Sequence, residues 1–335
     1  MIHFLQILLL LRRKILLILL LIPHVFISCS REYDYRNTQT KKVNRQYKTQ
    51  NVILVVVDGL RYSEGWGDST HQYIPRMAGI VSKEGVINTQ FYNPGDTYTS
   101  AGHSNLTTGI YQTIDNGGLE LPDNPSLFQY WNQVYGKDQK KSWIIASKDK
   151  LAVLGDCKNR YWSGKYNPMV NTGIEGRGIG SGYREDSLTL KTVLEILKVQ
   201  QPNLVLINFR DPDYSAHSGV WTSYVDGIRK TDDYVYRLWQ FLQDDLYYRN
   251  TTTLFVTSDH GRHLDSVADG FVSHGDGCEG CRHLNFFALG PDFKKGLQVN
   301  VNREQIDVPV TIAELLGFEF PNSQGNIMFE LFQRK

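Results

Sequence analysis

The chain of 335 residues is 41% hydrophobic and 21% charged, values that are ordinary for a globular protein and exclude a largely disordered one. Its 36 basic and 35 acidic side chains nearly balance, and outside residues 1–28 the balance is 33 basic against 35 acidic. A chain this close to neutral lacks the basic footprint of nucleic-acid-binding proteins, so we expect no nucleic-acid-binding surface.

Residues 1–29 have the features of an export leader. The basic triplet 12–14 forms a positive region, and the apolar run 15–27 is shorter than the ~20 residues of a comfortable membrane span. The sequence "VFISCS" around Cys29 resembles a bacterial lipoprotein signal, in which the cysteine becomes the lipidated first residue. An ordinary cleaved signal and an uncleaved anchor are the alternatives. All three predict export, and we favour a periplasmic or cell-surface lipoprotein held at the membrane through its N-terminus.

Residues 30–50 are polar and aperiodic, which is typical of a tether, and residues 51–335 are expected to form a single domain. The domain opens on "NVILVVVDGL", an apolar run typical of a strand buried on both faces. Similar runs follow at "SWIIAS", "NLVLINF", "TTLFVTS" and "NFFALG", with helical patterns between them at 186–199 and 223–245. This alternation predicts an α/β fold with a mostly parallel central sheet and helices on both of its faces.

Charged side chains follow directly on four of the predicted buried strands. These residues are Asp58, Lys148, Asp211, Asp213, Asp259 and His260. Active sites of such folds lie beyond the carboxyl ends of the strands, so we expect these side chains to converge there. Converging carboxylates repel one another unless positive charge lies among them, which favours a metal site.

A set of carboxylates and imidazoles can supply two metal ions with three protein ligands each. The candidates are Asp58, Asp213, His217, Asp259, His260 and His274. Three protein ligands leave positions open for substrate, which is typical of a catalytic site, and the mixture of oxygen and nitrogen suits zinc best, with manganese or iron as alternatives. Taken singly, each motif is more often a turn, a helix cap or a solvated loop. Their joint placement at strand ends is what indicates metal.

Several motifs occur in a fixed order along residues ~50–320: "VVVDGLR", "TSAGHSNLTTG", "DPDYSAH", "SDHGR", "HGDG", "ALGP" and "DVPVTIAELLG". This order resembles the alkaline phosphatase superfamily, most of all its nucleotide pyrophosphatase/phosphodiesterase and threonine-dependent phosphatase branches. The resemblance implies an alkaline-phosphatase-like fold with two zinc ions, as in two-metal phosphoryl-transfer sites. It implies one ion on Asp58, Asp259 and His260, and the other on Asp213, His217 and His274.

The stretch "TYTSAGH", residues 97–103, offers several hydroxyl groups beside an imidazole. In the threonine-using branches the nucleophile stands four residues before this histidine, which implies Thr99, with Ser100 as the runner-up. A threonine hydroxyl is a poor nucleophile until a metal or a base activates it, and the implied zinc ions supply that activation. His103 is then expected to hold the loop by hydrogen bonds rather than to act as the base.

The stretch "ASKDKLAVL" resembles the Lys-x-Arg element of some threonine-dependent phosphomonoesterases, whose two cations contact the non-bridging phosphate oxygens. Here the pair is Lys148 and Lys150, and the second lysine cannot make the bidentate contact of an arginine. A solvated surface pair is the alternative. If the pair binds phosphate it favours a dianionic monoester, and Asn116 is expected to be a further phosphate contact.

Together these features predict an exported two-metal phosphoester hydrolase that forms a covalent phosphothreonine on a small phosphorylated substrate, with monoesters slightly preferred. A phosphodiesterase or nucleotide pyrophosphatase is the main alternative. The aromatic residues Tyr62, Trp66, Trp162 and Tyr166 could build its nucleobase slot or equally belong to the core. A sulfatase is less favoured because the chain has no Cys-x-Pro-x-Arg type element to supply the processed nucleophile. A phosphoryl transferase and a non-catalytic surface lipoprotein complete the alternatives.

Three cysteines follow the leader: Cys157, Cys278 and Cys281. The last two form "CEGC", whose spacing suits a metal site but supplies only two of the four ligands of a structural zinc. In an exported protein a disulfide is the preferred interpretation, free thiols come next, and a metal site is the least favoured. The sequence leaves these three interpretations open, with the disulfide preferred.

Overall fold

The computed structural model describes residues 40–43, 47–136 and 138–333, apart from the side chain of Val81. The predicted leader with Cys29, and most of the predicted tether, lie outside the described residues. Within the described ranges, no helix combines the length and the apolar character that crossing a membrane requires.

The last part of the segment expected to be a tether packs on the domain. Lys42 forms an isolated antiparallel bridge with Phe318. The buried hydroxyl of Thr49 lies 2.7 Å from the hydroxyl of Thr253 and donates to Asp292 at 2.7 Å. The folded unit therefore includes residues before position 51.

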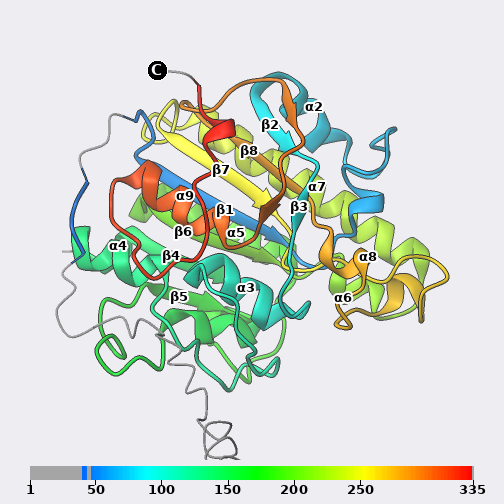
Figure 1. Ribbon diagram of the computed structural model, residues 1–335, viewed down its shortest axis with the longest axis horizontal. Helices are drawn as coiled ribbons and strands as arrows, with labels where there is room; N and C mark the ends of the chain where they lie inside the picture. Colours follow the sequence, from blue (N-terminus) through cyan, green and yellow to red (C-terminus); the bar gives the residue numbers. More distant parts are fainter. Residues whose placement is uncertain (1–39, 44–46, 137, 334–335) are drawn as a thin grey trace, which may run out of the picture. The chain divides into compact units, whose positions relative to one another are not determined.

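The central sheet has eight strands in the order β5-β4-β6-β1-β7-β8-β2-β9 (Figure 1). The strands are β1 Asn51–Val57, β2 Gly85–Asn88, β4 Ser142–Ala146, β5 Met169–Thr172, β6 Leu204–Phe209, β7 Thr252–Thr257, β8 Phe286–Leu289 and β9 Leu297–Val299. Only β8 runs against its neighbours, because it pairs antiparallel with β7 and with β2 while every other pair in this sheet is parallel. The predicted α/β fold with a mostly parallel sheet is confirmed. Strands β3 Phe91–Tyr92 and β10 Arg303–Glu304 form a separate small ladder.

Helices cover both faces of this sheet (Figure 1). On one face lie α2 Pro75–Glu84, α5 Asp186–Gln200 and α7 Trp221–Asp244; on the other lie α3 Thr99–Thr108, α4 Leu127–Tyr135 and α9 Asp307–Leu316. The two longest predicted helices, 186–199 and 223–245, correspond to α5 and α7 within two residues at each end. Helix α9 ends at Gly317, whose φ of +72° is the left-handed conformation that glycine adopts without strain.

Short helical segments complete the chain. They are α6 Asp213–Ala216, α8 Glu279–Arg282, η1 Tyr62–Glu64, η2 Gln139–Lys141, η3 Asp149–Gly155, η4 Ile174–Gly176, η5 Gly270–Val272 and η6 Phe329–Leu331. Several of them carry polar residues at the carboxyl edge of the sheet, where the loops that leave the strands gather.

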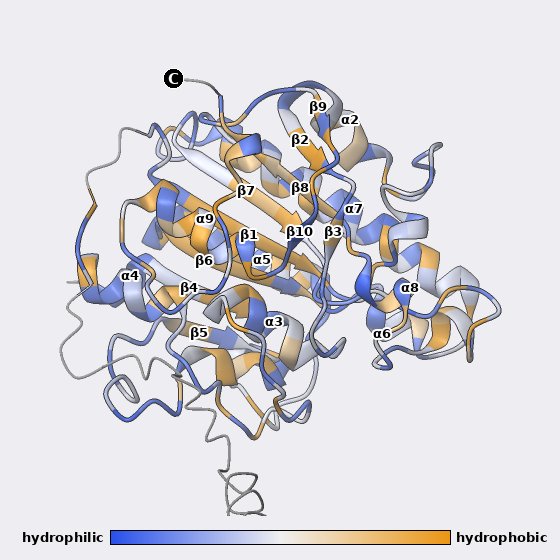
Figure 2. Cartoon of the chain, viewed as in Figure 1, coloured by the Kyte–Doolittle hydropathy of each residue, from blue (hydrophilic) through white to orange (hydrophobic). Residues whose placement is uncertain are grey.

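The strands that carry the predicted site are apolar on both faces. All seven residues of β1 are buried, and Ile53, Val55 and Val57 belong to the core formed with α5 and α7. Figure 2 shows this apolar colour concentrated on the sheet, with polar colour on the connecting loops. Because successive residues of a strand face opposite sides, a strand buried by helices on both faces must be apolar throughout, as the continuous run of β1 is.

The register brings the ends of the central strands level. Val57 of β1 pairs with Phe209 of β6, and Val56 pairs with Thr257 of β7. Residues that follow these strands therefore emerge at one edge of the sheet, as the sequence predicts.

One leucine pair on α5 tests how the burial of this helix stabilises the fold. Leu190 is 1% exposed in the core between α5 and the sheet, whereas Leu188 on the same helix is 53% exposed. We expect Leu190→Ala to lower the free energy of unfolding by about 2–5 kcal/mol, since it leaves a cavity. Leu188→Ala is the control and should change it by less than about 0.5 kcal/mol in urea unfolding. Equal effects of the two substitutions would contradict the packing of α5 described here.

Candidate active site

Three carboxylates converge at the carboxyl edge of the sheet. Asp58 follows β1, Asp259 follows β7, and Asp213 lies beyond β6 at the start of α6, and all three side chains are buried. The ammonium group of Lys148 lies among them, 2.8 Å from Oδ1 of Asp58 and 2.7 Å from Oδ2 of Asp213. The charge that the sequence placed at these strand ends is therefore gathered in one site.

Three imidazoles face these carboxylates. Nε2 of His260 lies 3.5 Å from both Asp58 and Asp259, and Nε2 of His274 lies 3.3 Å from Asp213. The rings of His260 and His274 stack with their centroids 3.7 Å apart. His217 is half exposed, with Nε2 3.4 Å from Asp213. The structure thus brings all six predicted metal ligands together.

The other ring nitrogens of two of these histidines are already engaged. Nδ1 of His260 lies 2.8 Å from the carbonyl of Gly261, and Nδ1 of His274 lies 2.9 Å from the carbonyl of Thr97. A hydrogen bond from Nδ1 to a carbonyl fixes the tautomer and leaves the Nε2 lone pair for a metal. Both Nε2 atoms therefore point at the carboxylates. Burial lowers the pKa of His260, but the charge of Asp259 and a hydrogen bond to Asp58 outweigh burial and raise it, so a metal would displace a proton from this ring.

The arrangement fits divalent metal ions on its own chemistry. Oδ2 of Asp259 is buried without a hydrogen-bond partner among the described residues, and a buried polar atom of this kind is costly unless something coordinates it. In the part of the chain that the structure describes, two buried lysine or arginine side chains contact these three carboxylates, Lys148 and Arg262. Additional positive charge at this place would relieve both conditions.

The pKa values of Asp213 and His274 reflect the competition between burial and the neighbouring charges. Burial raises the pKa of Asp213, but the charge of Lys148 and hydrogen bonds from His217 and His274 outweigh burial and hold that pKa well below its usual range. Burial and the nearby charge of His260 lower the pKa of His274 to about 4. His274 is therefore neutral at pH 7, which is the state in which an imidazole binds metal.

The closest groupings of ligand atoms differ from the predicted division into two sets. Within 4.8 Å of one another lie, in one group, Asp213, His260 and His274, and in the other, Asp58, His103 and Asp259. His260 falls between the two groups because its Nε2 points at Asp58 and Asp259 while its ring stacks on His274.

His103 has protein partners at both ring nitrogens. Nδ1 lies 2.9 Å from the carbonyl of Thr99, and Nε2 lies 3.2 Å from Nδ2 of Asn208. These contacts join α3 to β6, so the ring is placed as a scaffold between them.

Thr99 is the first residue of α3, and its hydroxyl faces the charged groups. Oγ1 lies 3.1 Å from Nζ of Lys148 and 3.4 Å from Nε2 of His260. The positive end of a helix at this position favours negative charge on the hydroxyl oxygen. By contrast, Ser100 has a buried hydroxyl with no hydrogen-bond partner among the described residues, and Thr97 accepts from the backbone of Gly277 at 3.2 Å.

The three predicted substrate contacts lie close together. Nζ of Lys150 donates to Oδ1 of Asn116 at 3.0 Å, and the same oxygen accepts from the backbone N–H of Ser100. Lys148 and Lys150 are both buried, so they are not a solvated surface pair. Burial and the charge of Lys148 lower the pKa of Lys150 to about 8.

Two side chains of the site were missed by the sequence reasoning. Arg262 contacts Asp213 and donates to Nδ1 of His217 at 3.3 Å, and Asn208 donates to Oδ2 of Asp58 at 3.0 Å. Asn208 is the single polar residue of the apolar strand β6, and Arg262 directly follows the "SDHG" motif. Both residues could therefore have been predicted as site residues from the sequence. Asp211, expected at this edge, instead accepts from Ser215 and forms a turn.

The aromatic residues suggested for a nucleobase slot are scattered. Trp66 is buried against Phe287, and Trp162 is buried against Tyr130. These two tryptophans belong to the core. Tyr166, whose ring centroid lies 5.7 Å from that of Trp162, is exposed.

The Sulfatase family model matches residues 50–318 of this chain. Among curated proteins, the phosphopentomutase of Herpetosiphon aurantiacus is 24% identical over 184 residues, which make up 55% of this chain and 42% of that protein. The chain spans less than half the length of the curated relatives it matches.

Solved structures share the fold. A protein of the alkaline phosphatase superfamily from Vibrio parahaemolyticus gives a TM-score of 0.62 at 14% identity, over 88% of this chain and 73% of that one. Murine ectonucleotide pyrophosphatase/phosphodiesterase 5 gives 0.56 at 17% identity, over 85% of this chain and 100% of that one. An inactive threonine-to-alanine variant of the murine protein is solved in complex with AMP. With the family match, these structures confirm the superfamily indicated by the motifs.

Two helical glycines test how closely α3 approaches the site. A Cβ added at Gly102 would lie 2.2 Å from the carbonyl oxygen of Asp259, whereas a Cβ at Gly79 in α2 meets nothing within 4 Å. We expect Gly102→Ala to destabilise the fold by about 1–3 kcal/mol, since the backbone beside Asp259 must shift. Gly79→Ala should stabilise it by about 0.4–1 kcal/mol in the same urea unfolding measurement. Stabilisation by both substitutions would contradict the close approach of α3.

Proposed function

This chain belongs to the Sulfatase family, and from that premise we propose that it is a metal-dependent phosphoester hydrolase with Thr99 as its nucleophile. The observation that carries the proposal is the position of one hydroxyl. Oγ1 of Thr99 opens α3 and lies within 3.4 Å of both Lys148 and His260, beside the buried carboxylates. A phosphoryl group is the substrate that suits a hydroxyl surrounded by cations and metal-binding side chains.

Two divalent ions, most simply zinc, would supply positive charge that lowers the pKa of the attacking hydroxyl and neutralises the phosphoryl oxygens. One would be held by Asp58, Asp259 and His260. The other would be held by Asp213, His217 and His274.

The side chains of the protein then divide the remaining work. Lys148 donates to Oγ1 of Thr99, which fixes the hydroxyl and stabilises negative charge on it. Burial lowers the pKa of Lys148, but Asp213 and Asp58 outweigh burial and raise it, so the ammonium stays charged. Lys150 contacts Asn116, which accepts from the backbone N–H of Ser100, the residue after Thr99, and both side chains would contact the non-bridging oxygens of a phosphoryl group.

The proposed reaction has two halves. Oγ1 of Thr99 forms a bond to phosphorus as the bond to the leaving oxygen breaks, and the leaving group departs with a proton. Water then attacks the phosphothreonine and releases inorganic phosphate with the restored hydroxyl. His103 stays outside both steps, because its two ring nitrogens are engaged with Thr99 and Asn208.

Phosphate esters are favoured over sulfate esters by the start of α3. The helix begins Thr99-Ser100-Ala101-Gly102-His103, and the chain contains no Cys-x-Pro-x-Arg type element from which a sulfatase nucleophile is made. The names of the curated relative and the murine neighbour, a phosphopentomutase and a phosphodiesterase, point the same way.

A monoester is our first choice of substrate, because two buried amines beside Thr99 offer more positive charge than a singly charged diester requires. A phosphodiesterase is the second candidate, favoured by the murine fold neighbour solved with AMP. Export and lipid tethering through Cys29 belong to the proposal as well, and they concern residues outside the described ranges.

Replacement of the nucleophile tests the reaction directly. We expect Thr99→Ala to lower kcat for the best ester by roughly 10³-fold or more, since only binding and electrostatic effects remain. Wild-type protein quenched in acid during turnover should carry a phosphate on the peptide that contains Thr99.

The matched control is Ser100→Ala, the neighbouring hydroxyl, which should turn over near the wild-type rate. The panel should include a monoester, a diester and a sulfate ester, each with and without chelator. Retained turnover in Thr99→Ala with loss in Ser100→Ala would reassign the nucleophile. Preferred hydrolysis of the sulfate ester, or full activity after exhaustive chelation, would overturn the proposed function.

The pKa of Lys150 predicts a pH dependence of substrate binding. With a pKa of about 8 the side chain is charged below pH 8 and loses its charge above it, so KM for a dianionic monoester should rise as pH passes through about 8. Lys150→Arg keeps its charge across this range and should flatten the rise. An identical alkaline rise of KM in both proteins would show that Lys150 does not contact the substrate.

A further inference from the structure

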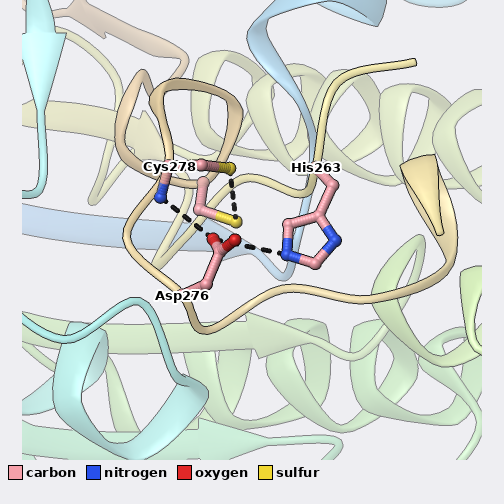
Figure 3. Close-up of side chains that lie close together, drawn as sticks. His263, Asp276 and Cys278 are labelled. Atoms are coloured by element: carbon pink, nitrogen blue, oxygen red, sulfur yellow. Dashed lines mark hydrogen bonds and ion pairs between the residues drawn. The ribbon is translucent and has the colours of Figure 1, made fainter. Parts of the chain in front are cut away.

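A second cluster of metal-binding side chains lies apart from the carboxylate site. It consists of His263, Asp276, Cys278 and Cys281, and one ligand atom of each lies within 4.8 Å of all the others (Figure 3). The sequence analysis found only the two cysteines, which are half of a zinc site. The fold supplies the other half from residues before and beside the "CEGC" motif.

The two cysteines form a turn that presents both sulfur atoms on one side. Cys278 caps the short helix α8, and the backbone N–H of Cys281 donates to the carbonyl of Cys278 at 3.0 Å. The sulfur atoms lie 3.5 Å apart as thiols, so the disulfide preferred from the sequence is not formed in this structure. Asp276 lies beside the turn, with Oδ1 accepting from the backbone N–H of Cys278 at 3.0 Å.

His263 points an unsatisfied nitrogen into this turn. Its side chain is 7% exposed, and Nε2 is buried with no hydrogen-bond partner among the described residues, 3.3 Å from Oδ1 of Asp276. Nδ1 lies 2.9 Å from Oδ1 of Asp269, which also accepts from Ser273 at 2.7 Å. A carboxylate that holds one imidazole nitrogen leaves the other as a lone pair for a metal.

The distances match the edges of a small tetrahedron. Zinc bonds of about 2.0–2.3 Å to nitrogen, oxygen and sulfur place tetrahedral ligands about 3.3–3.8 Å apart. The two measured edges, 3.5 Å between the sulfurs and 3.3 Å between His263 and Asp276, fall in this range. Little rearrangement is needed for all four atoms to meet one ion.

We propose that His263, Asp276, Cys278 and Cys281 bind a structural zinc ion. Binding would release two thiol protons, and two thiolates, one carboxylate and one neutral imidazole would fill the coordination sphere. Four protein ligands leave no open position, which is typical of a structural site, and the two thiolates select zinc over magnesium, calcium or manganese. The inference does not depend on the reaction proposed for Thr99.

The surrounding loop explains what such an ion would do. Most of the stretch 264–279 is exposed or half-buried, and it carries His274, one of the proposed ligands of the carboxylate site. Phe271 packs its ring on Trp221 and Tyr224 at the core, so hydrophobic contact holds the loop at this one side chain. An ion bound by His263 and Asp276 would close it at both ends, on either side of His274, and limit its freedom.

The sulfur ligands give the test a signal that the carboxylate site cannot produce. The full chain, purified with zinc and without air, should show zinc with sulfur neighbours at about 2.3 Å by X-ray absorption. Cobalt-substituted protein should show a thiolate-to-cobalt charge-transfer band. Both signals should be lost in Cys278→Ser and in His263→Ala, and kept in Cys157→Ala, which removes a cysteine outside the cluster.

Several outcomes would overturn the site. One is a disulfide between Cys278 and Cys281. It would appear as a wild-type mass that is lower by two hydrogen atoms, with the difference located in the peptide that contains both cysteines. Another is the absence of sulfur neighbours around zinc in zinc-loaded wild-type protein, which needs no variant to fold. If the wild-type protein shows zinc with sulfur neighbours but hydrolyses none of the esters, the proposed reaction fails and the zinc site stands. The two failures are therefore distinguishable.

Discussion

The active site depends on the burial of three carboxylates at the ends of adjacent strands. In the order β6-β1-β7, Asp213, Asp58 and Asp259 leave neighbouring strands that lie about 4.8 Å apart, so their charges cannot avoid one another. Like charges at such distances in a poorly polar interior are costly unless cations lie between them. This need for positive charge explains why a lysine and an arginine contact the carboxylates. It also explains why the imidazoles point at them and why the site suits metal ions.

Lys148 connects the charge balance of the carboxylates with the candidate nucleophile. Its ammonium contacts Asp58, Asp213 and the hydroxyl of Thr99, so a single group neutralises the carboxylates and orients the candidate nucleophile. A buried cation that is paired in this way cannot be removed without leaving uncompensated charge behind. The position of the Thr99 hydroxyl is therefore set by the electrostatics of the strand ends as well as by the start of α3.

The sequence predicts those parts of the molecule that follow from local pattern. Apolar runs predict the central strands, and the rule that strand ends converge places Asp58, Asp213 and Asp259 in one site. Prediction from the sequence fails for residues whose function depends on contacts with residues far away in the chain. Arg262 could have been a surface residue of a turn, and only its approach to Asp213 makes it part of the site. His263 was overlooked for the same reason, because the path of a loop brings it to the cysteines. Asp276 was overlooked although it lies only two residues before Cys278.

The six residues after β7 join the two clusters through one stretch of backbone. Asp259, His260 and Arg262 contact the carboxylate site, while His263 faces the cysteines. The backbone between them has no room to shift, since a Cβ at Gly261 would lie 2.0 Å from the carbonyl oxygen of Gly280 and its N–H donates to Cys281 at 2.8 Å. Besides this backbone contact and the packing of Phe271 on the core, the proposed ion would hold the loop at His263 and Asp276. The geometry of His274 in one site is in this way tied to the ligands of the other.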